Sequence, residues 1–518
     1  MANAKMSWLV AGLLLLALVV RLPGITRPLV GNFATKNVVY AMIARNWAEG
    51  RSDFRYPTLD CLAGGQRSLH MLELPCSAYL TGWLWKTLGG SLDVWGRATA
   101  IGFSLASVGL LFSLVRRRHG PVAAAGAAMA LAISPVSIVY GQSFMLEASL
   151  VVFTVGTVWC LDRWLAGGRH VWLPAAALCL SLLLLTKIYM LVMLLPLAVM
   201  ILRRTPDAGP DAESCRERAA WRSRRSEKLS PDVRQGTPRS AFPTRETLLA
   251  AALLTLALIP AAAWYTHAAR TAADSRLAPR IYYSVLDSAA VHRPPHPLLW
   301  SPDFYRQILD DLAGVVLTPL GLALAMAGLL HPAWRRYLPW LLATALLVAA
   351  LPLKFHQMNY YWMAALPPLA ILVGLGWQQI HDRLALGRTA VVMVLAVALL
   401  FSLRYAVRPA MFTPPADRAV AAAGRTMQRL TAADEPVVTM HGSGIDLLYY
   451  CRRPGWALSP DTPQLDRLLH QCRVQGARYL VVVAEPELSR RIGASSATDR
   501  SGPQAGGDGY AVYRLASP

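Results

Sequence analysis

The 518-residue chain is poor in charged residues, which make up 16% of it against about 25% in soluble domains. It has few acidic residues in particular: 30 of them face 51 basic ones, and the net charge is +21. A soluble nucleic-acid-binding fold would carry such a basic excess on its surface. Here the Lys and Arg residues gather in short loops between apolar runs. The composition therefore excludes an ordinary soluble domain and favours a membrane protein, as the mean hydropathy of +0.37 also indicates.

Three other features are missing from the sequence. No cysteine spacing is typical of a zinc or iron–sulfur site. No internal repeat is present, although repeated halves are usual in transporters. No small-residue cleavage site follows the first apolar run, so that run is expected to remain as a membrane span rather than to be removed as a signal peptide.

The apolar residues form runs of roughly 17–22 positions, the length that crosses a hydrocarbon layer about 30 Å thick. If the N-terminus is cytoplasmic, every loop on that side is basic, as the positive-inside rule requires. An odd number of spans then places the C-terminal part outside. The sequence predicts eleven spans, at roughly residues 7–23, 97–115, 121–138, 145–163, 171–186, 188–202, 247–265, 313–330, 337–353, 360–377 and 388–405.

The predicted organisation is a transmembrane domain over residues 1–408 and an outer domain over 409–518. Long outside loops cover about 23–96 and 266–312, and a basic segment at 203–246 is predicted to be a disordered cytoplasmic loop. Within the first outside loop, Ala78–Leu88 is apolar and aromatic but too short to span, and is expected to lie on the membrane surface.

The C-terminal part has the pattern of a small α/β domain. Pro436–Met440 and Tyr479–Val483 are short β-branched runs typical of buried strands. Leucines at helical spacing between Leu465 and Cys472 predict a helix that stops at Gly476. If the compartment outside is oxidising, it would permit disulfides between two pairs of cysteines: Cys61 with Cys76, and Cys451 with Cys472.

Charged side chains are costly near membrane depth, so those that persist beside the outside ends of spans are the first functional candidates. Four positions qualify, Glu73, Glu147, Lys187 and His356, and the predicted topology puts all four on one face of the membrane. Each of them alone is equally well read as an interfacial residue that reaches towards water. Together they favour a site.

Several short motifs around these residues occur in a recognisable order. They are Tyr40-Ala-Met-Ile-Ala-Arg-Asn-Trp47 after the first span, Glu73-Leu-Pro75 before an aromatic helix, Gly96-Arg97 at the second span, Met145-Leu-Glu147, Leu-Thr-Lys187 ahead of a span with Pro196, and His356 before Tyr360-Tyr361. This order resembles the GT-C-fold glycosyltransferases that use polyprenyl-phosphate sugars, a family with protein O-mannosyltransferases and the lipid A aminoarabinose transferase. The tail around Leu448–Trp456 also looks like the outer domain of such proteins.

The resemblance implies a bacterial inner-membrane enzyme with the GT-C fold. Such an enzyme transfers a sugar on the outer face from an undecaprenyl-phosphate-like donor to a hydroxyl of a lipid, glycan or protein. A base must take the hydroxyl proton, and a carboxylate does so well once burial raises its pKa. Glu73, Asp60 and Glu147 compete for this role, with Glu73 ranked first, and Glu73 with Glu147 is also a candidate pair for a divalent metal.

The leaving phosphate needs cations and hydrogen-bond donors to hold its growing charge. The candidates for this contact are Lys36, Arg45, Lys187, His356, Tyr360 and Tyr361. One position departs from the family pattern: an acidic residue usually precedes the Tyr-Ala helix, whereas here Thr35-Lys36-Asn37 holds no carboxylate. The departure leaves open an inactive family member that scaffolds envelope assembly, and a lipid-linked sugar transporter is the other alternative.

Overall fold

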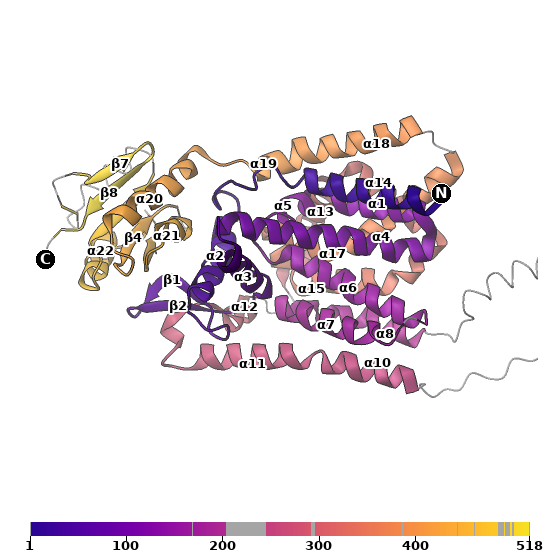
Figure 1. Cartoon of the computed structure of the whole chain (residues 1–518), viewed down its shortest axis with the longest axis horizontal. Coiled ribbons are helices and arrows are strands. Elements are labelled where there is room, and N and C mark those ends of the chain that lie inside the picture. Colours follow the sequence, from indigo (N-terminus) through magenta and orange to yellow (C-terminus); the bar gives the residue numbers. More distant parts are fainter. Residues whose placement is uncertain are drawn as a thin grey trace, which may run out of the picture.

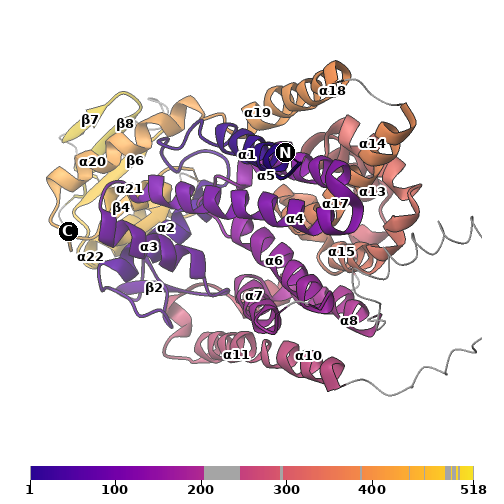
Figure 2. The same ribbon diagram turned by 45° about the vertical axis from the view of Figure 1, so that its right-hand side comes forward.

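The computed structural model describes residues 2–167, 169–203, 245–291, 296–384, 388–442, 444–459, 461–484, 492, 498–499 and 502–516. A body of apolar helices carries a sheet-containing part at one end, next to helices α2 (Ala34–Ala48) and α3 (Cys76–Leu88) (Figure 1). The turned view keeps the sheet on the same side as α2 and α3 (Figure 2). The N-terminus lies at the opposite end of the helical body from the C-terminus (Figure 1).

Within the described residues, five helices are long and apolar enough to cross a membrane, or up to six if a bent helix pair is one span. Four shorter apolar helices accompany them. The helices of this body are α1 (Ala2–Val19), α4 (Leu92–Ile133), α5 (Pro135–Tyr140), α6 (Glu147–Leu165), α7 (Trp172–Thr186), α8 (Leu194–Leu202), α10 (Arg245–Leu256), α11 (Ile259–Ala273), α13 (Pro302–Asp311), α14 (Thr318–Leu329), α15 (Leu338–Ala350), α16 (Pro352–Gln357), α17 (Trp362–Leu384) and α18 (Arg388–Phe401).

Helix α4 is two helices joined at a break. Gly120 has φ +83°, a conformation that favours glycine, and Pro121 follows it. The break falls next to the basic residues at 116–118, where the sequence predicts a cytoplasmic loop between two spans. The position of the break therefore agrees with two separate passages through the membrane.

Glycines let the central helices approach each other closely. A methyl group placed on Gly376 of α17 would lie 1.9 Å from the carbonyl oxygen of Leu324 in α14. A methyl group on Gly328 of α14 would lie 2.1 Å from the carbonyl oxygen of Leu372 in α17. The two backbones therefore touch directly, as small residues allow in membrane helix packing.

One eight-stranded sheet joins distant parts of the chain. Its order is β3 (Ile281–Ser284), β2 (Gln66–Met71), β1 (Thr58–Ala63), β5 (Gly455–Leu458), β4 (Val437–Met440), β6 (Tyr479–Val483), β8 (Tyr510–Arg514) and β7 (Ala505–Gly507). Strands β1, β2 and β3 come from the two long loops predicted outside, and β1 pairs with β5 at Cys61 and Gly455. The sheet thus begins in the loops and continues into the C-terminal part.

Strands β4 and β6 in the C-terminal part are buried on both faces, which explains their apolar runs. Leu480 and Val482 of β6 pack in a cluster with helix α22 (Leu465–Val474). Val481 and Val483 alternate with them and belong to the core that extends to the membrane helices. The predictions of strands at 437–440 and 479–483 and of the helix from Leu465 are confirmed.

The two predicted disulfides are absent, since Cys61, Cys76, Cys451 and Cys472 are all free thiols. The separation is clearest for the C-terminal pair. Cys451 ends helix α21 (Asp446–Cys451) and packs in the core shared with the membrane helices. Cys472 packs in the other cluster, with α22. Sharing a compartment therefore did not bring these thiols together.

Candidate active site

Glu73 lies in the turn between β2 and helix α3 (Cys76–Leu88), and backbone contacts fix this turn against the membrane helices. The N–H of Leu74 donates to the carbonyl of Leu185, near the end of α7, at 3.1 Å. The indole N–H of Trp264 in α11 donates to the carbonyl of Leu72, also at 3.1 Å. The carboxylate of Glu73, 1% exposed, therefore faces Lys187, the residue that directly follows α7.

Glu73 is held as an anion. The ammonium of Lys187 lies 3.2 Å from its Oε1, and the hydroxyl of Tyr40 donates a hydrogen bond to the same oxygen. Burial opposes ionisation, but Lys187 and then Lys36 outweigh it and lower the pKa of Glu73 to about 2. The expectation that burial raises the pKa of this carboxylate is wrong, because the fold places the ammonium groups of Lys187 and Lys36 near it.

Lys36 brings the second cation from helix α2 (Ala34–Ala48), one turn before Tyr40. Its ammonium lies 5.9 Å from the centre of the Tyr283 ring in β3. Burial lowers the pKa of Lys36, with Glu73 acting in the opposite direction. Lys36 is partly exposed, so this side of the cluster opens towards solvent.

Glu147 supplies a second carboxylate from the first turn of α6. It is 3% exposed, and its Oε2 has no hydrogen-bond partner among the described residues. Lys187 and Lys36 both lie within electrostatic range of it. The structure thus brings Glu73, Glu147, Lys36 and Lys187 into one charged cluster, as the predicted topology indicated for three of them.

Aromatic rings form a wall beside the cluster. Tyr360 and Tyr361 stack with their centres 4.9 Å apart, and Tyr189 packs on Tyr361 at 5.4 Å. Phe33 makes an edge contact with Tyr360 at 5.2 Å, and with Tyr140 at 5.7 Å. Stacked rings offer apolar faces for a sugar or a prenyl chain, while the tyrosine hydroxyls can donate to a phosphate.

Three residues near the cluster were not selected from the sequence. Tyr40 donates to Glu73, Tyr283 faces Lys36, and His70 of β2 packs its ring edge-on against Tyr40 at 6.3 Å. Tyr40 begins one of the sequence motifs, and His70 stands three residues before Glu73, but neither was chosen as a site residue. Tyr283 arrives through the pairing of β2 with β3, which local sequence does not reveal.

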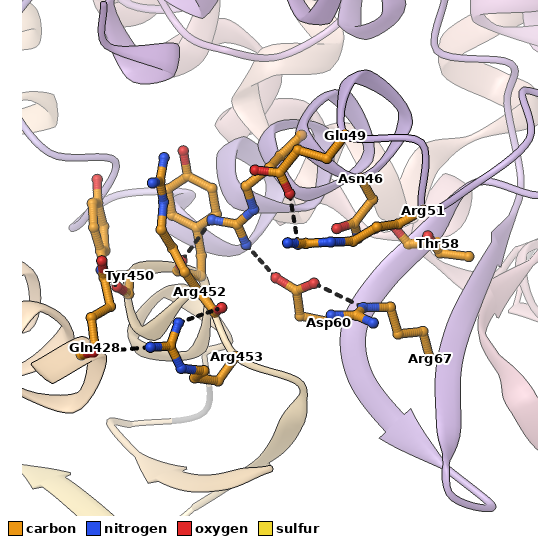
Figure 3. A network of polar contacts seen from close by, with 12 residues as sticks. Asn46, Glu49, Arg51, Thr58, Asp60, Arg67, Gln428, Tyr450, Arg452 and Arg453 are labelled. Atoms are coloured by element: carbon orange, nitrogen blue, oxygen red, sulfur yellow. Dashed lines mark hydrogen bonds and ion pairs between the residues drawn. The ribbon is translucent and has the colours of Figure 1, made fainter. Parts of the chain in front are cut away.

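Asp60 lies elsewhere, in a polar network between α2, β1 and the C-terminal part (Figure 3), and Arg45 is its partner. The guanidinium of Arg45 pairs with Asp60 and donates to the carbonyl of Tyr449 at 3.0 Å. Arg67 adds a second contact to Asp60 at 3.3 Å. Both side chains are 1% exposed. Through the carbonyl of Tyr449 the pair connects α2 and β1 with the C-terminal part, whereas Glu73 contacts Lys187 and Tyr40.

His356 is also separate from the cluster. It is exposed at the end of α16, where its ring lies 6.4 Å from Phe304. No group of three or more His, Cys, Asp or Glu residues in the described ranges has the arrangement of a metal site. Glu73 faces an ammonium group, so its surroundings do not fit a cation at that carboxylate.

Comparison with known proteins identifies the fold. Residues 75–207 match the family model described as dolichyl-phosphate-mannose-protein mannosyltransferase. No curated protein matches the sequence.

Two crystal structures of ArnT from Cupriavidus metallidurans match over the full chain at 15% identity. The apo structure has a TM-score of 0.59 and covers 100% of this chain and 99% of ArnT. The structure of ArnT bound to undecaprenyl phosphate has a TM-score of 0.60 and covers both chains completely. The resemblance drawn from the sequence motifs is thus confirmed, and the chain has the GT-C glycosyltransferase fold.

Proposed function

We propose that the chain transfers a sugar from an undecaprenyl-phosphate-like donor to an acceptor hydroxyl at the outer face of the cytoplasmic membrane. The observation that carries this proposal is the cluster of Lys36, Lys187, Glu73 and Glu147, set against an aromatic wall. ArnT, which shares the fold, is known bound to undecaprenyl phosphate. The matching mannosyltransferase family supports the same class of donor.

The cluster provides the charges that the transfer requires. The acceptor oxygen bonds to the anomeric carbon, and the bond from that carbon to the phosphate oxygen breaks with its electron pair left on the phosphate. Lys36 and Lys187 hold the growing negative charge of the polyprenyl phosphate, and the tyrosines of the wall add hydrogen bonds. Glu73 is ionised and stabilises the positive charge that develops on the sugar ring.

The proposed topology has eleven spans, with the N-terminus in the cytoplasm and the C-terminal α/β part outside. Support comes from the five long apolar helices, the bent pair and the four shorter apolar helices of the described residues, with the first long helix counted as two spans because of its break at Gly120. Helix α8 ends and helix α10 begins at the end of the bundle where the N-terminus lies (Figure 1). The basic segment 203–246, of which 204–244 lie outside the described residues, is therefore assigned to the cytoplasmic side, and the residues of the cluster to the outer side.

The first test uses the purified full-length protein in lipid nanodiscs with radiolabelled polyprenyl-phosphate sugars. Transfer of label is followed to water and to an added envelope extract. The wild type is expected to use at least one donor, and Glu73→Gln to be slower by about 100- to 1,000-fold, the cost of losing one charge that stabilises the transition state. Glu49→Gln is the matched control and is expected to retain activity. Glu49 is an exposed carboxylate that directly follows α2 and pairs with Arg51.

Two results would contradict the proposal. Tight binding of a donor without any release of sugar would support the inactive scaffold. Movement of the intact donor across liposome membranes, insensitive to Glu73→Gln, would support the transporter.

A further inference from the structure

His70 stands out because its burial is not matched by hydrogen bonds. It lies near the end of β2 and is 2% exposed. Neither of its ring nitrogens has a hydrogen-bond partner among the described residues. Buried polar side chains nearly always find partners, and a buried group that lacks one requires an explanation.

The ring belongs to the charged cluster by its position. His70 pairs with Tyr283 across β2 and β3, so the two side chains share one face of the sheet. Tyr283 in turn faces the ammonium of Lys36, and the His70 ring packs on Tyr40, the residue that donates to Glu73. Glu73, Lys36 and Lys187 all lie within electrostatic range of the imidazole.

At the two positions where a base is expected first, the cluster lacks an effective proton acceptor. The position where the family usually carries a carboxylate holds Lys36. Glu73 accepts hydrogen bonds from Lys187 and Tyr40 and stays ionised, so its affinity for a further proton is low. Transfer to a hydroxyl nevertheless releases a proton, which a nearby base must take.

Resting on the proposed function, we infer that His70 is the catalytic base that takes the proton of the acceptor hydroxyl. One ring nitrogen receives this proton while the acceptor oxygen bonds to the anomeric carbon and the polyprenyl phosphate departs with the electron pair. The carboxylate of Glu73 stabilises the imidazolium that results. The acceptor enters from the side of Lys36 and Tyr283, which are partly exposed.

The electrostatics agree with this role. Burial lowers the pKa of His70 to about 4, and Lys36 and Lys187 act in the same direction against Glu73. The free ring is therefore neutral at any pH well above 4, so one of its nitrogens carries a lone pair that is free for the acceptor proton. The rate of wild-type transfer is expected to be level from pH 7 down to about pH 5 and to fall below it.

The test compares His70→Ala and His70→Gln with the wild type in nanodiscs, using the donor that the wild type accepts. Both variants are expected to lose about 100- to 10,000-fold in kcat, the usual contribution of a general base, while the KM for the donor changes little. Added imidazole should restore part of the activity of His70→Ala but not of His70→Gln, whose side chain fills the space. The restored rate should increase with the free-base fraction of imidazole, through about pH 7.

His470→Ala is the matched control, since His470 is exposed on α22. Near-wild-type kcat in His70→Ala would overturn the inference. A loss of activity without imidazole rescue, together with weaker donor binding and lower thermal stability, would assign His70 a structural role and overturn it too. Failure of the wild type with every donor would instead contradict the proposed function, so the two failures are distinguishable.

Discussion

The two carboxylates of the cluster differ in their hydrogen-bond partners. Glu73 and Glu147 are both buried carboxylates, yet Glu73 has a lysine and a tyrosine on one oxygen, while an oxygen of Glu147 has no hydrogen-bond partner within the described ranges. A carboxylate tied to an ammonium group keeps its charge and is a weak base. Electrostatic stabilisation by Glu73 and proton transfer to His70 can therefore be performed by separate residues.

Asp60 gives a prediction at the scale of a single residue. Replacing it by asparagine removes the counter-charge of Arg45 and leaves a buried guanidinium unpaired, at a cost of about 3–5 kcal/mol. Asp60→Asn is expected to lower the apparent unfolding temperature in a thermal shift measurement, and Asp53→Asn, on an exposed side chain, to leave it unchanged. Loss of turnover with unchanged stability would instead favour Asp60 as the base.

The site residues that could be predicted from the sequence are those whose charged side chains are energetically unfavourable beside a membrane. The sequence identified Glu73, Glu147 and Lys187, because charged side chains beside membrane spans are costly and usually have a function. Tyr40 and Tyr283 were not found, because tyrosines are common near membrane interfaces and carry no such signal. Their roles depend on contacts between segments far apart in the sequence.

Among the elements, helices α14 and α17 are in backbone contact and depend on glycine. Gly376→Ala would place a methyl group against the carbonyl of Leu324 and force the helices apart. The expected result is a lower unfolding temperature and reduced yield of folded protein in detergent. Gly102→Ala on α4 is the control, because nothing lies within 4 Å of its added methyl group. Equal stability of both variants would show that the α14–α17 contact can open at little cost.

Some strands of the sheet can be predicted from their own residues and others cannot. The runs at 437–440 and 479–483 are β-branched and buried on both faces, so local pattern was enough. Strands β1 and β2 contain few β-branched residues and were read as part of a long loop. They pair with each other around Gly64-Gly65. The sheet continues because β5 pairs with β1 and β3 with β2, and this pairing between distant segments leaves no mark on local composition.

At the scale of the whole molecule, the proposed topology can be tested with impermeant maleimide on intact spheroplasts. Cys215 lies in the basic segment 203–246 and is expected to react only after the membrane is opened. A cysteine introduced as Val474→Cys, at a position 73% exposed on α22, is expected to react from outside. Both proteins carry Cys76→Ser and Cys179→Ser, which remove the two partly exposed thiols, and the protein for the second measurement also carries Cys215→Ser. Labelling of Cys215 in intact cells would contradict the assignment of its loop to the cytoplasm.

The shared sheet has a consequence for how the protein is made. Strand β1 is synthesised long before its partner β5. Until β5 follows, one edge of β1 offers unpaired backbone groups, the feature by which strands associate wrongly with other chains. Completion of the sheet must therefore wait for the synthesis of β5, and a chain truncated after the last span would be expected to aggregate rather than to act as a smaller enzyme.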